Sequence, residues 1–174
     1  MKPKFNVGEI VDVVIDKRGR EWPIIKLHDG IYGFRDCPLC SVYNESKDNG
    51  SFEESDACKA MIEWIDENMT PDQLKRLGKP FIASLYNIIG KKAYELTNPS
   101  EGEIQFDYYK DWHNRVKSCP DLSETYQTEF GARYWTSSPY YDDTVYVCGI
   151  ILNGNSDISP SDCKYGIAPC FKGE

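Results

Sequence analysis

The chain has 174 residues, a formal net charge of -8 at pH 7, 40% hydrophobic residues and 13% aromatic residues. This length is enough for one buried core but short for two ordinary domains, so we expect a single domain over residues 1–174. The acidic balance, without a cluster of Lys and Arg, argues against nucleic-acid binding. The many Tyr and Trp residues favour a recognition role, because these side chains bring large contact area to binding surfaces.

No apolar run is long enough to cross a bilayer, and the first residues, MKPKFNVGEIVDVV, lack the apolar stretch and cleavage site of a signal peptide. We therefore expect a soluble chain with no membrane insertion. Export would then occur as part of a larger assembly, such as a virus particle released by lysis.

The first part of the chain predicts strands. Residues 9–27, EIVDVVIDKRGREWPIIKL, contain two β-branched runs around a charged turn with Gly19 and predict a hairpin. Residues 28–34, HDGIYGF, predict a turn and a short strand. Turn-forming residues dominate from Cys37 to Gly50, which predicts a loop.

A first helix is predicted within residues 51–69. Ser51 followed by Glu54 fits a capping box at its start. The apolar residues at helical spacing on one face are Ala57, Met61, Trp64 and Ile65.

Two more helices are predicted before residue 97. Thr70, with Pro at the next position and Gln73 after it, starts a short helix that Gly78 ends. Residues 80–96 predict a third helix, with Ser84 near its start. Its predicted buried stripe consists of Ile82, Leu85, Ile88 or Ile89, and Tyr94.

The pattern weakens over residues 98–130, which predicts a short helix or an irregular segment. Three strand-like stretches follow, ARYWTSS, TVYVCGIIL and YGIAPCF, separated by polar turns. In the second stretch apolar residues occupy both alternating sets, so both of its faces are expected to be covered. Strands at both ends around central helices predict an α+β fold, in which both chain ends form one antiparallel sheet with two or three helices packed on it.

The sequence contains none of the common catalytic or nucleotide-binding motifs, and no complete calcium-loop pattern. We interpret His28 as a surface residue and His113, close to Asp111, as structural. The adjacent carboxylates Asp142 and Asp143 are interpreted as solvated positions. We therefore expect no enzyme activity, no cofactor and no metal site.

Seven cysteines are present. Cys37 and Cys40, in CPLC, have the spacing of a zinc site or a redox turn, but the chain has no second pair of this kind. We interpret the cysteines as reduced thiols that pack like small hydrophobic side chains. A zinc site built from this pair and two distant thiols is the alternative.

The last forty residues combine strand-like stretches with turns rich in Tyr, Asn, Ser and Asp. Adaptable polar and aromatic side chains in the connections of a rigid strand scaffold are typical of binding surfaces. As a set, these turns favour binding, although each residue is also an ordinary turn former.

Several motifs, in their order, resemble a known family. FEESDACKAMI, KPFIASLYNII, YWTSSPYYDDTVYVCGIILNG and YGIAPCF are similar to the bacterial and phage C-type lectin-like domains related to the formylglycine-generating enzyme fold. These domains include the variable proteins of diversity-generating retroelements. The similarity runs from Val7 onward, with two departures: Ala168 replaces the usual Arg of the last strand, and Ala83 stands where Pro is frequent.

The resemblance implies a C-type lectin-like fold with a binding role. The paired cysteines of the enzymes and the calcium-binding triplets of animal lectins have no counterpart here, so the resemblance does not extend to catalysis. It implies that Trp135 packs in the core. The ligand-binding residues that it implies are Tyr134, Thr136, Ser138, Tyr140, Tyr141, Asp142, Tyr146, Asn153, Asn155 and Asp157.

We therefore expect a non-enzymatic binding module that recognises a cell-surface protein or glycan, as a tail or head fibre component of a phage virion. Its expected location is the virion surface, or the bacterial cytoplasm before assembly. The alternative is a structural virion protein that docks on neighbouring subunits, with other virion proteins as partners and an oligomer as a possible state.

Overall fold

The computed structural model describes residues 4–46, 51–143 and 145–173. Its helices are α1 (Asp56–Asn68), α2 (Pro71–Leu77) and α3 (Leu85–Ile89). Its strands are β1 (Ile10–Ile15), β2 (Glu21–His28), β3 (Ile31–Phe34), β4 (Leu39–Val42), β5 (Lys79–Phe81), β6 (Gln127–Thr128), β7 (Gly131–Ala132), β8 (Tyr134–Pro139), β9 (Tyr146–Ile150), β10 (Ser156–Pro160), β11 (Lys164–Ile167) and β12 (Cys170–Lys172). The described part of the chain is thus a mixed α+β structure with mostly antiparallel sheets, as the sequence predicts.

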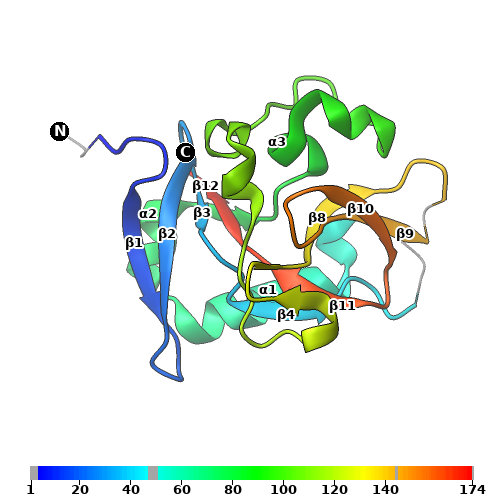
Figure 1. Cartoon of the computed structure of the whole chain (residues 1–174). Coiled ribbons are helices and arrows are strands. Elements are labelled where there is room, and N and C mark those ends of the chain that lie inside the picture. Colours follow the sequence, from blue (N-terminus) through cyan, green and yellow to red (C-terminus); the bar gives the residue numbers. More distant parts are fainter. Residues whose placement is uncertain (1–3, 47–50, 144, 174) are drawn as a thin grey trace.

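The first five-stranded sheet has the order β1-β2-β3-β12-β5. The predicted hairpin is confirmed as β1 and β2, with Val14 opposite Trp22. β12 pairs antiparallel with β3 on one side and with β5 on the other. Strands from the two ends of the chain therefore share one antiparallel sheet, as expected, and Figure 1 shows β12 beside β3.

The second five-stranded sheet has the order β10-β9-β8-β11-β4. The predicted strand YGIAPCF is divided between the two sheets, because β11 belongs to this one and β12 to the first, with Ala168 and Pro169 between them. Two strands lie where only turns were predicted: β4 pairs with β11, and β10 pairs with β9. Residues 47–50 of the predicted loop, and Thr144 in the predicted second strand, lie outside the described residues.

The central strands of the second sheet are buried on both faces. Along β8, Tyr134 belongs to one cluster of buried side chains and Trp135 to another. Along β9, Cys148 belongs to the cluster that contains Tyr134, and Val147 belongs to the cluster that contains Trp135. This alternation follows from the two-residue period of a strand, and it confirms the prediction that both faces are covered. α3 contributes to the cluster around Tyr134, and α1 to the cluster around Trp135.

The helix starts agree with the sequence in two cases out of three. Thr70 and Ser84 cap α2 and α3, each in a full capping box. The predicted cap at Ser51 is wrong, because Ser55 accepts the hydrogen bond from the Cys58 N–H at 3.0 Å and α1 begins after it. Ser51 precedes only a short 3-10 turn, Phe52–Glu54.

The third helix is shorter than predicted. α3 ends at Gly90, whose φ of 66° is a conformation that favours glycine, and a Cβ there would lie 2.7 Å from Gln105 Oε1. The chain continues as a 3-10 helix, Gly90–Glu95, which changes the period of its side chains. Tyr94 is consequently 62% exposed, so its predicted place on a buried stripe is wrong.

The irregular segment over residues 98–130 contains three short 3-10 turns, Asp107–Lys110, Trp112–Arg115 and Glu124–Tyr126, rather than an α-helix. Within the described residues, no helix is long and apolar enough to span a membrane.

Candidate functional site

The turn between β8 and β9, together with the first residue of β9, carries four of the predicted binding residues, of which Tyr141 and Asp142 are exposed. We call Tyr140, Tyr141, Asp142, Asp143 and Tyr146 the hairpin tip. The Tyr140 N–H donates to the Tyr146 carbonyl at 3.0 Å, and the Tyr146 N–H donates to the Asp143 carbonyl at 3.1 Å. These two hydrogen bonds connect the residues at the start and at the end of the turn.

A contact outside the hairpin also fixes the tip. The Tyr141 N–H donates to the Leu96 carbonyl at 3.0 Å. Leu96 follows the 3-10 helix that carries exposed Tyr94. The tip therefore lies against a second aromatic segment, in which the rings of Tyr86 and Tyr94 meet edge to face at 6.0 Å.

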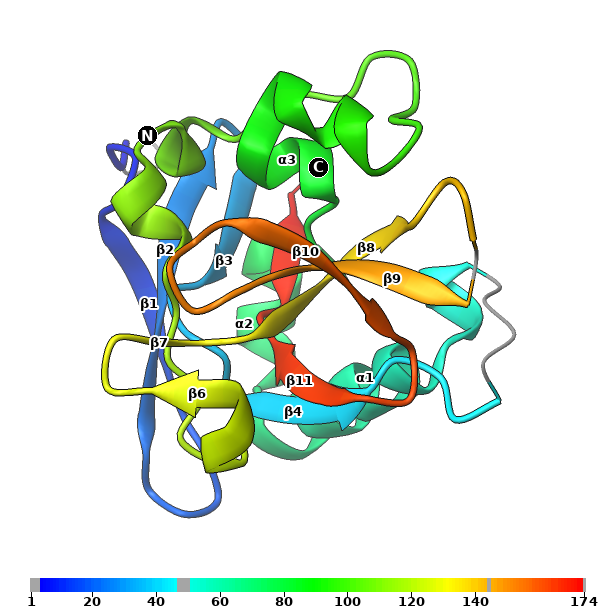
Figure 2. The same ribbon diagram turned by 45° about the vertical axis from the view of Figure 1, so that its right-hand side comes forward.

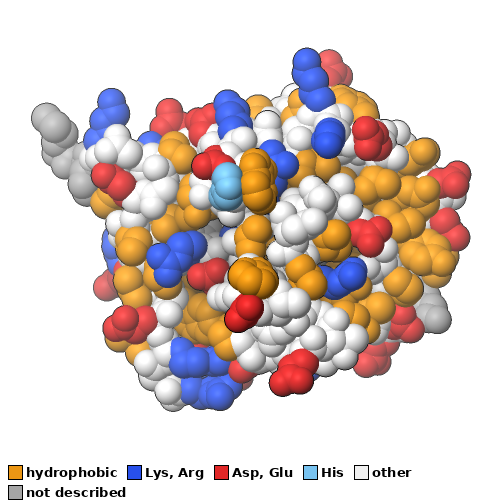
Figure 3. Space-filling view, in the orientation of Figure 1, with side chains coloured by type: hydrophobic (Ala, Val, Ile, Leu, Met, Phe, Trp, Pro, Cys, Tyr) orange, Lys and Arg blue, Asp and Glu red, His pale blue; other side chains and the backbone are white. Residues whose placement is uncertain are grey.

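The side chains of the tip combine aromatic area with carboxylates. Tyr141 is 52% exposed, and its ring lies 5.2 Å from that of half-buried Tyr140. Asp142 and Asp143 are exposed beside them. Desolvation, followed by the Asp142 carboxylate, raises the pKa of Tyr140. Figure 3 shows hydrophobic and acidic side chains together over this end of the molecule.

Three predicted ligand residues are buried, which corrects the prediction for them. Tyr134 is 2% exposed, and its hydroxyl donates to the Arg115 carbonyl at 2.6 Å. Thr136 Oγ1 donates to the Cys148 carbonyl at 2.7 Å, and Ser138 Oγ accepts the Leu85 N–H at 2.9 Å. Tyr134 and Trp135 of β8 belong to two different clusters of buried side chains, so both faces of this strand are covered and these side chains cannot meet a ligand at the surface.

The remaining predicted residues do not join the hairpin tip. Asn153 and Asn155 are exposed in the turn between β9 and β10, where Asn153 Oδ1 accepts the Asn155 N–H at 3.1 Å. This turn and the hairpin tip lie at opposite ends of β9 (Figure 2). Asp157 is exposed on β10, and its carboxylate lies 3.9 Å from the Arg133 guanidinium. The predicted surface is thus divided into two separate patches.

The two histidines pair with neighbouring carboxylates. His28 Nδ1 lies 2.9 Å from Asp107 Oδ2, and the ring is half-buried rather than on the open surface. His113 Nδ1 lies 2.8 Å from Asp111 Oδ1, as the sequence suggested, but in an exposed position. Neither histidine is hydrogen-bonded to a serine or cysteine side chain in these contacts.

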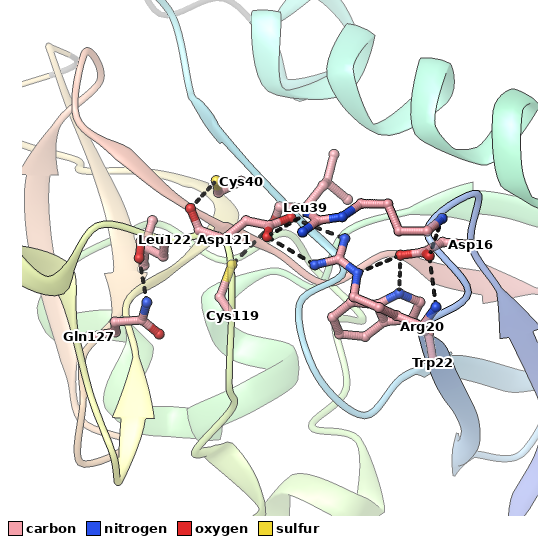
Figure 4. Close-up of polar contacts among 10 residues, drawn as sticks. Asp16, Arg20, Trp22, Leu39, Cys40, Cys119, Asp121, Leu122 and Gln127 are labelled. Atoms are coloured by element: carbon pink, nitrogen blue, oxygen red, sulfur yellow. Dashed lines mark hydrogen bonds and ion pairs between the residues drawn. The ribbon is translucent and has the colours of Figure 1, made fainter.

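A separate cleft of about 370 Å³ was not predicted from the sequence. It lies beside the turn between β1 and β2, and its lining includes Arg18, Arg20, Cys40, Asp121 and Lys164. The Arg20 guanidinium donates to both Asp121 carboxylate oxygens, at 2.9 and 3.1 Å, and Arg18 donates to the same carboxylate at 3.1 Å (Figure 4). Both arginines are already paired with Asp121, so neither guanidinium group is free to bind an anion in the cleft.

The cysteines do not form a metal site in the described part of the chain. Cys37 and Cys40 are both free thiols. Among the described residues, no group of three or more His, Cys, Asp or Glu side chains is placed to hold a metal ion. The arrangement gives no support to the zinc alternative.

Comparisons of this chain with protein-family models, with curated proteins and with solved structures found no significant match.

Proposed function

We propose that this chain is a non-enzymatic binding domain with a C-type lectin-like fold, and that its hairpin tip contacts a protein or glycan. The observation that carries the proposal is the tip itself. Tyr141 and the two adjacent carboxylates are exposed on a turn that backbone hydrogen bonds hold at both of its strands and at Leu96. A preorganised turn loses little conformational entropy when a ligand binds.

The chemistry of the tip suits both ligand classes. A tyrosine ring can stack on the apolar face of a sugar or fill a shallow protein pocket, and carboxylates accept directional hydrogen bonds from hydroxyl or amide groups. An acidic tip also disfavours anionic partners such as nucleic acid. The ligand we propose is therefore neutral or basic.

The lectin-like part of the proposal is supported by the arrangement of the strands. Strands from the two chain ends pair in one sheet, and the strands that carry the candidate loops form a second sheet. Trp135 is buried, at 2% exposure, in a cluster that includes side chains of β1, β2 and α1, as the resemblance implies for this position. In this proposal the domain is a tail or head fibre component of a phage virion that meets the surface of a host cell.

The proposal can be tested by binding of the labelled chain to intact bacterial cells and to a glycan array. The test variant is Tyr141→Ala with Asp142→Ala, which removes exposed side chains and leaves the backbone contacts of the turn. The matched control is Asn153→Ala with Asn155→Ala, at the other end of β9. We expect saturable binding that falls at least about tenfold in the tip variant and stays near the original level in the control.

Equal binding by the tip variant and the original chain would refute the proposed surface. If only the asparagine variant lost affinity, the ligand surface would be at the β9–β10 turn. Binding to purified phage particles or to other copies of the chain, without binding to cells or glycans, would favour the structural virion role.

A further inference from the structure

Two cysteine thiols that are far apart in the sequence lie side by side under the cleft. Cys40 Sγ donates to the Asp121 carbonyl at 3.7 Å, and Cys119 Sγ donates to the Leu39 carbonyl at 3.6 Å. Each thiol therefore lies against the backbone of the segment that carries the other. The side chains are also close enough for each thiol to shift the pKa of the other.

The two thiols differ in their access to solvent. Cys40 is half-buried and forms part of the cleft lining. Cys119 is fully buried, at 0% exposure. A small molecule in the cleft can therefore meet Cys40, whereas Cys119 does not line the cleft. Figure 4 shows the two thiols and their carbonyl partners.

The surroundings of Cys40 favour its thiolate. The neighbouring Cys119 thiol lowers the pKa of Cys40 to about 7; burial opposes this change, and the nearby Lys164 ammonium supports it. A thiol with this pKa is substantially ionised at neutral pH, and the thiolate is the nucleophilic form. The neighbouring Cys40 thiol, and after it burial, raise the pKa of Cys119, which therefore stays protonated.

We propose that Cys40 is a site of oxidation by small hydroperoxides entering the cleft, and that Cys119 resolves the oxidised Cys40 into a Cys40–Cys119 disulfide. The site rests on the adjacent position of the two sulfur atoms and on the opening of the cleft at only one of them. It is independent of the ligand-binding role of the hairpin tip.

The reaction has two steps. The Cys40 thiolate attacks one peroxide oxygen, so that an S–O bond forms, the O–O bond breaks, and the other oxygen leaves as water or an alcohol after taking a proton from solvent. The Cys119 sulfur then attacks the Cys40 sulfur, an S–S bond forms, and the hydroxyl leaves as water with the Cys119 proton. The two cysteines together lose two electrons, which reduce the peroxide.

Cys37, the other cysteine of the CPLC sequence, is a poorer partner. Its side chain is fully buried, and a Cβ added to Gly166 would lie 2.9 Å from its sulfur, which places that sulfur against β11. Desolvation by burial raises the pKa of the Cys37 thiol. The pair that the sequence spacing suggests is therefore not the pair that the fold brings into contact.

The disulfide would connect β4 to the segment that carries Asp121. This aspartate holds Arg18 and Arg20 at the turn between β1 and β2. Oxidation would thus join two segments that line the cleft, β4 and the segment with Asp121, by a covalent bond.

The test treats the folded, reduced chain with hydrogen peroxide near neutral pH, blocks the remaining thiols with iodoacetamide, and maps the peptides by mass spectrometry. We expect a linked pair of peptides containing Cys40 and Cys119, which dithiothreitol separates. Cys119→Ala should leave Cys40 as a sulfenic acid that dimedone captures, and Cys40→Ser should leave Cys119 reduced. Cys58→Ser, at another partly exposed thiol, is the matched control and should still form the disulfide.

The mapping of the unmutated chain is decisive by itself, so the test does not depend on whether a variant folds. A Cys37–Cys40 link, a link to any other cysteine, or no link to Cys119 while the chain stays folded would overturn the proposal. A Cys40–Cys119 link that formed only in denaturant would also overturn it.

Discussion

The Lys117 ammonium lies 5.2 Å from the centre of the Tyr109 ring, in the interior of the protein. Lys117 is 1% exposed, and its Nζ donates to the carbonyls of Phe34 and Arg35, at 3.2 and 2.8 Å. The Tyr134 ring approaches the same ammonium, at 5.7 Å. Two carbonyls and two aromatic faces thus replace the water that a buried cation loses.

Replacing this cation should destabilise the fold. Lys117→Met preserves most of the side-chain volume but leaves the two carbonyls without this donor, so we expect a loss of about 1–3 kcal/mol in the free energy of unfolding. Urea unfolding followed by tryptophan fluorescence measures the change. The control is Lys91→Met at an exposed lysine, where the change should be within about 0.5 kcal/mol. Equal stability of Lys117→Met would show that the buried ammonium contributes nothing to the fold.

Asp16 should make the stability depend on acid pH. Burial raises the pKa of this carboxyl, but hydrogen bonds from Trp22 Nε1 and from the backbone and side chain of Arg20 outweigh burial and lower the pKa to about 2. A carboxyl with a lower pKa in the folded state stabilises the fold above its unfolded pKa, near 4, and loses this contribution as the pH falls towards 2.

We therefore expect Asp16→Asn to lower the free energy of unfolding by about 2 kcal/mol at pH 7, and to flatten its decline between pH 4 and 2. Chemical unfolding at a series of pH values measures both effects. Glu129→Gln, at an exposed carboxylate, should keep the original profile. A profile for Asp16→Asn parallel to that of the original chain would contradict the expectation.

Ser138 should act as part of the core, although the sequence placed it on the binding surface. Its hydroxyl oxygen accepts the Leu85 N–H at the start of α3, and Ser138→Ala would leave this N–H unpaired. We expect a loss of about 1–2 kcal/mol of stability. Ser137→Ala, at the half-buried neighbour, should cost less. Thermal unfolding compares the two, and a larger cost at Ser137 would contradict the assignment.

The pH dependence of Cys40 alkylation should reveal the influence of the neighbouring Cys119 thiol. The rate of reaction with iodoacetamide should rise between pH 6 and 8 with a midpoint near 7, because the thiolate predominates above the thiol pKa. Cys119→Ala removes the neighbouring thiol that favours the thiolate, so the midpoint should move towards higher pH. Of the charges near Cys40, Lys164 favours the thiolate and Asp121 opposes it. An unchanged midpoint in the variant would exclude Cys119 as the cause.

Local patterns of the sequence predicted local structure well. The hairpin of β1 and β2 and the caps at Thr70 and Ser84 depend on residues that are near each other in the chain. β4 and β10 were not predicted, because their residues are turn formers and only pairing with β11 and β9 makes them strands.

For the candidate sites, too, the sequence predicted what depends on local residues and missed what depends on contacts between distant segments. The sequence correctly marked Tyr141 and Asp142 as exposed turn residues, but it could not show that other parts of the fold cover both faces of β8 and bury Tyr134 and Thr136. Cys40 and Cys119 are neighbours in the fold but far apart in the chain, so no local sequence pattern predicts their contact. The CPLC spacing suggested Cys37 as the partner of Cys40, whereas the fold places Cys119 beside it.

The place of β12 between β3 and β5 affects how the protein can be made. β3 is complete at residue 34, yet its partner strand ends at Lys172, so most of the chain must leave the ribosome before this pair can form. Until then the edges of β3 and β5 that face β12 have open backbone groups, which other chains can pair with. The pairing of β1, β2 and β3 and the completion of the first sheet by β12 are therefore separated in time during synthesis.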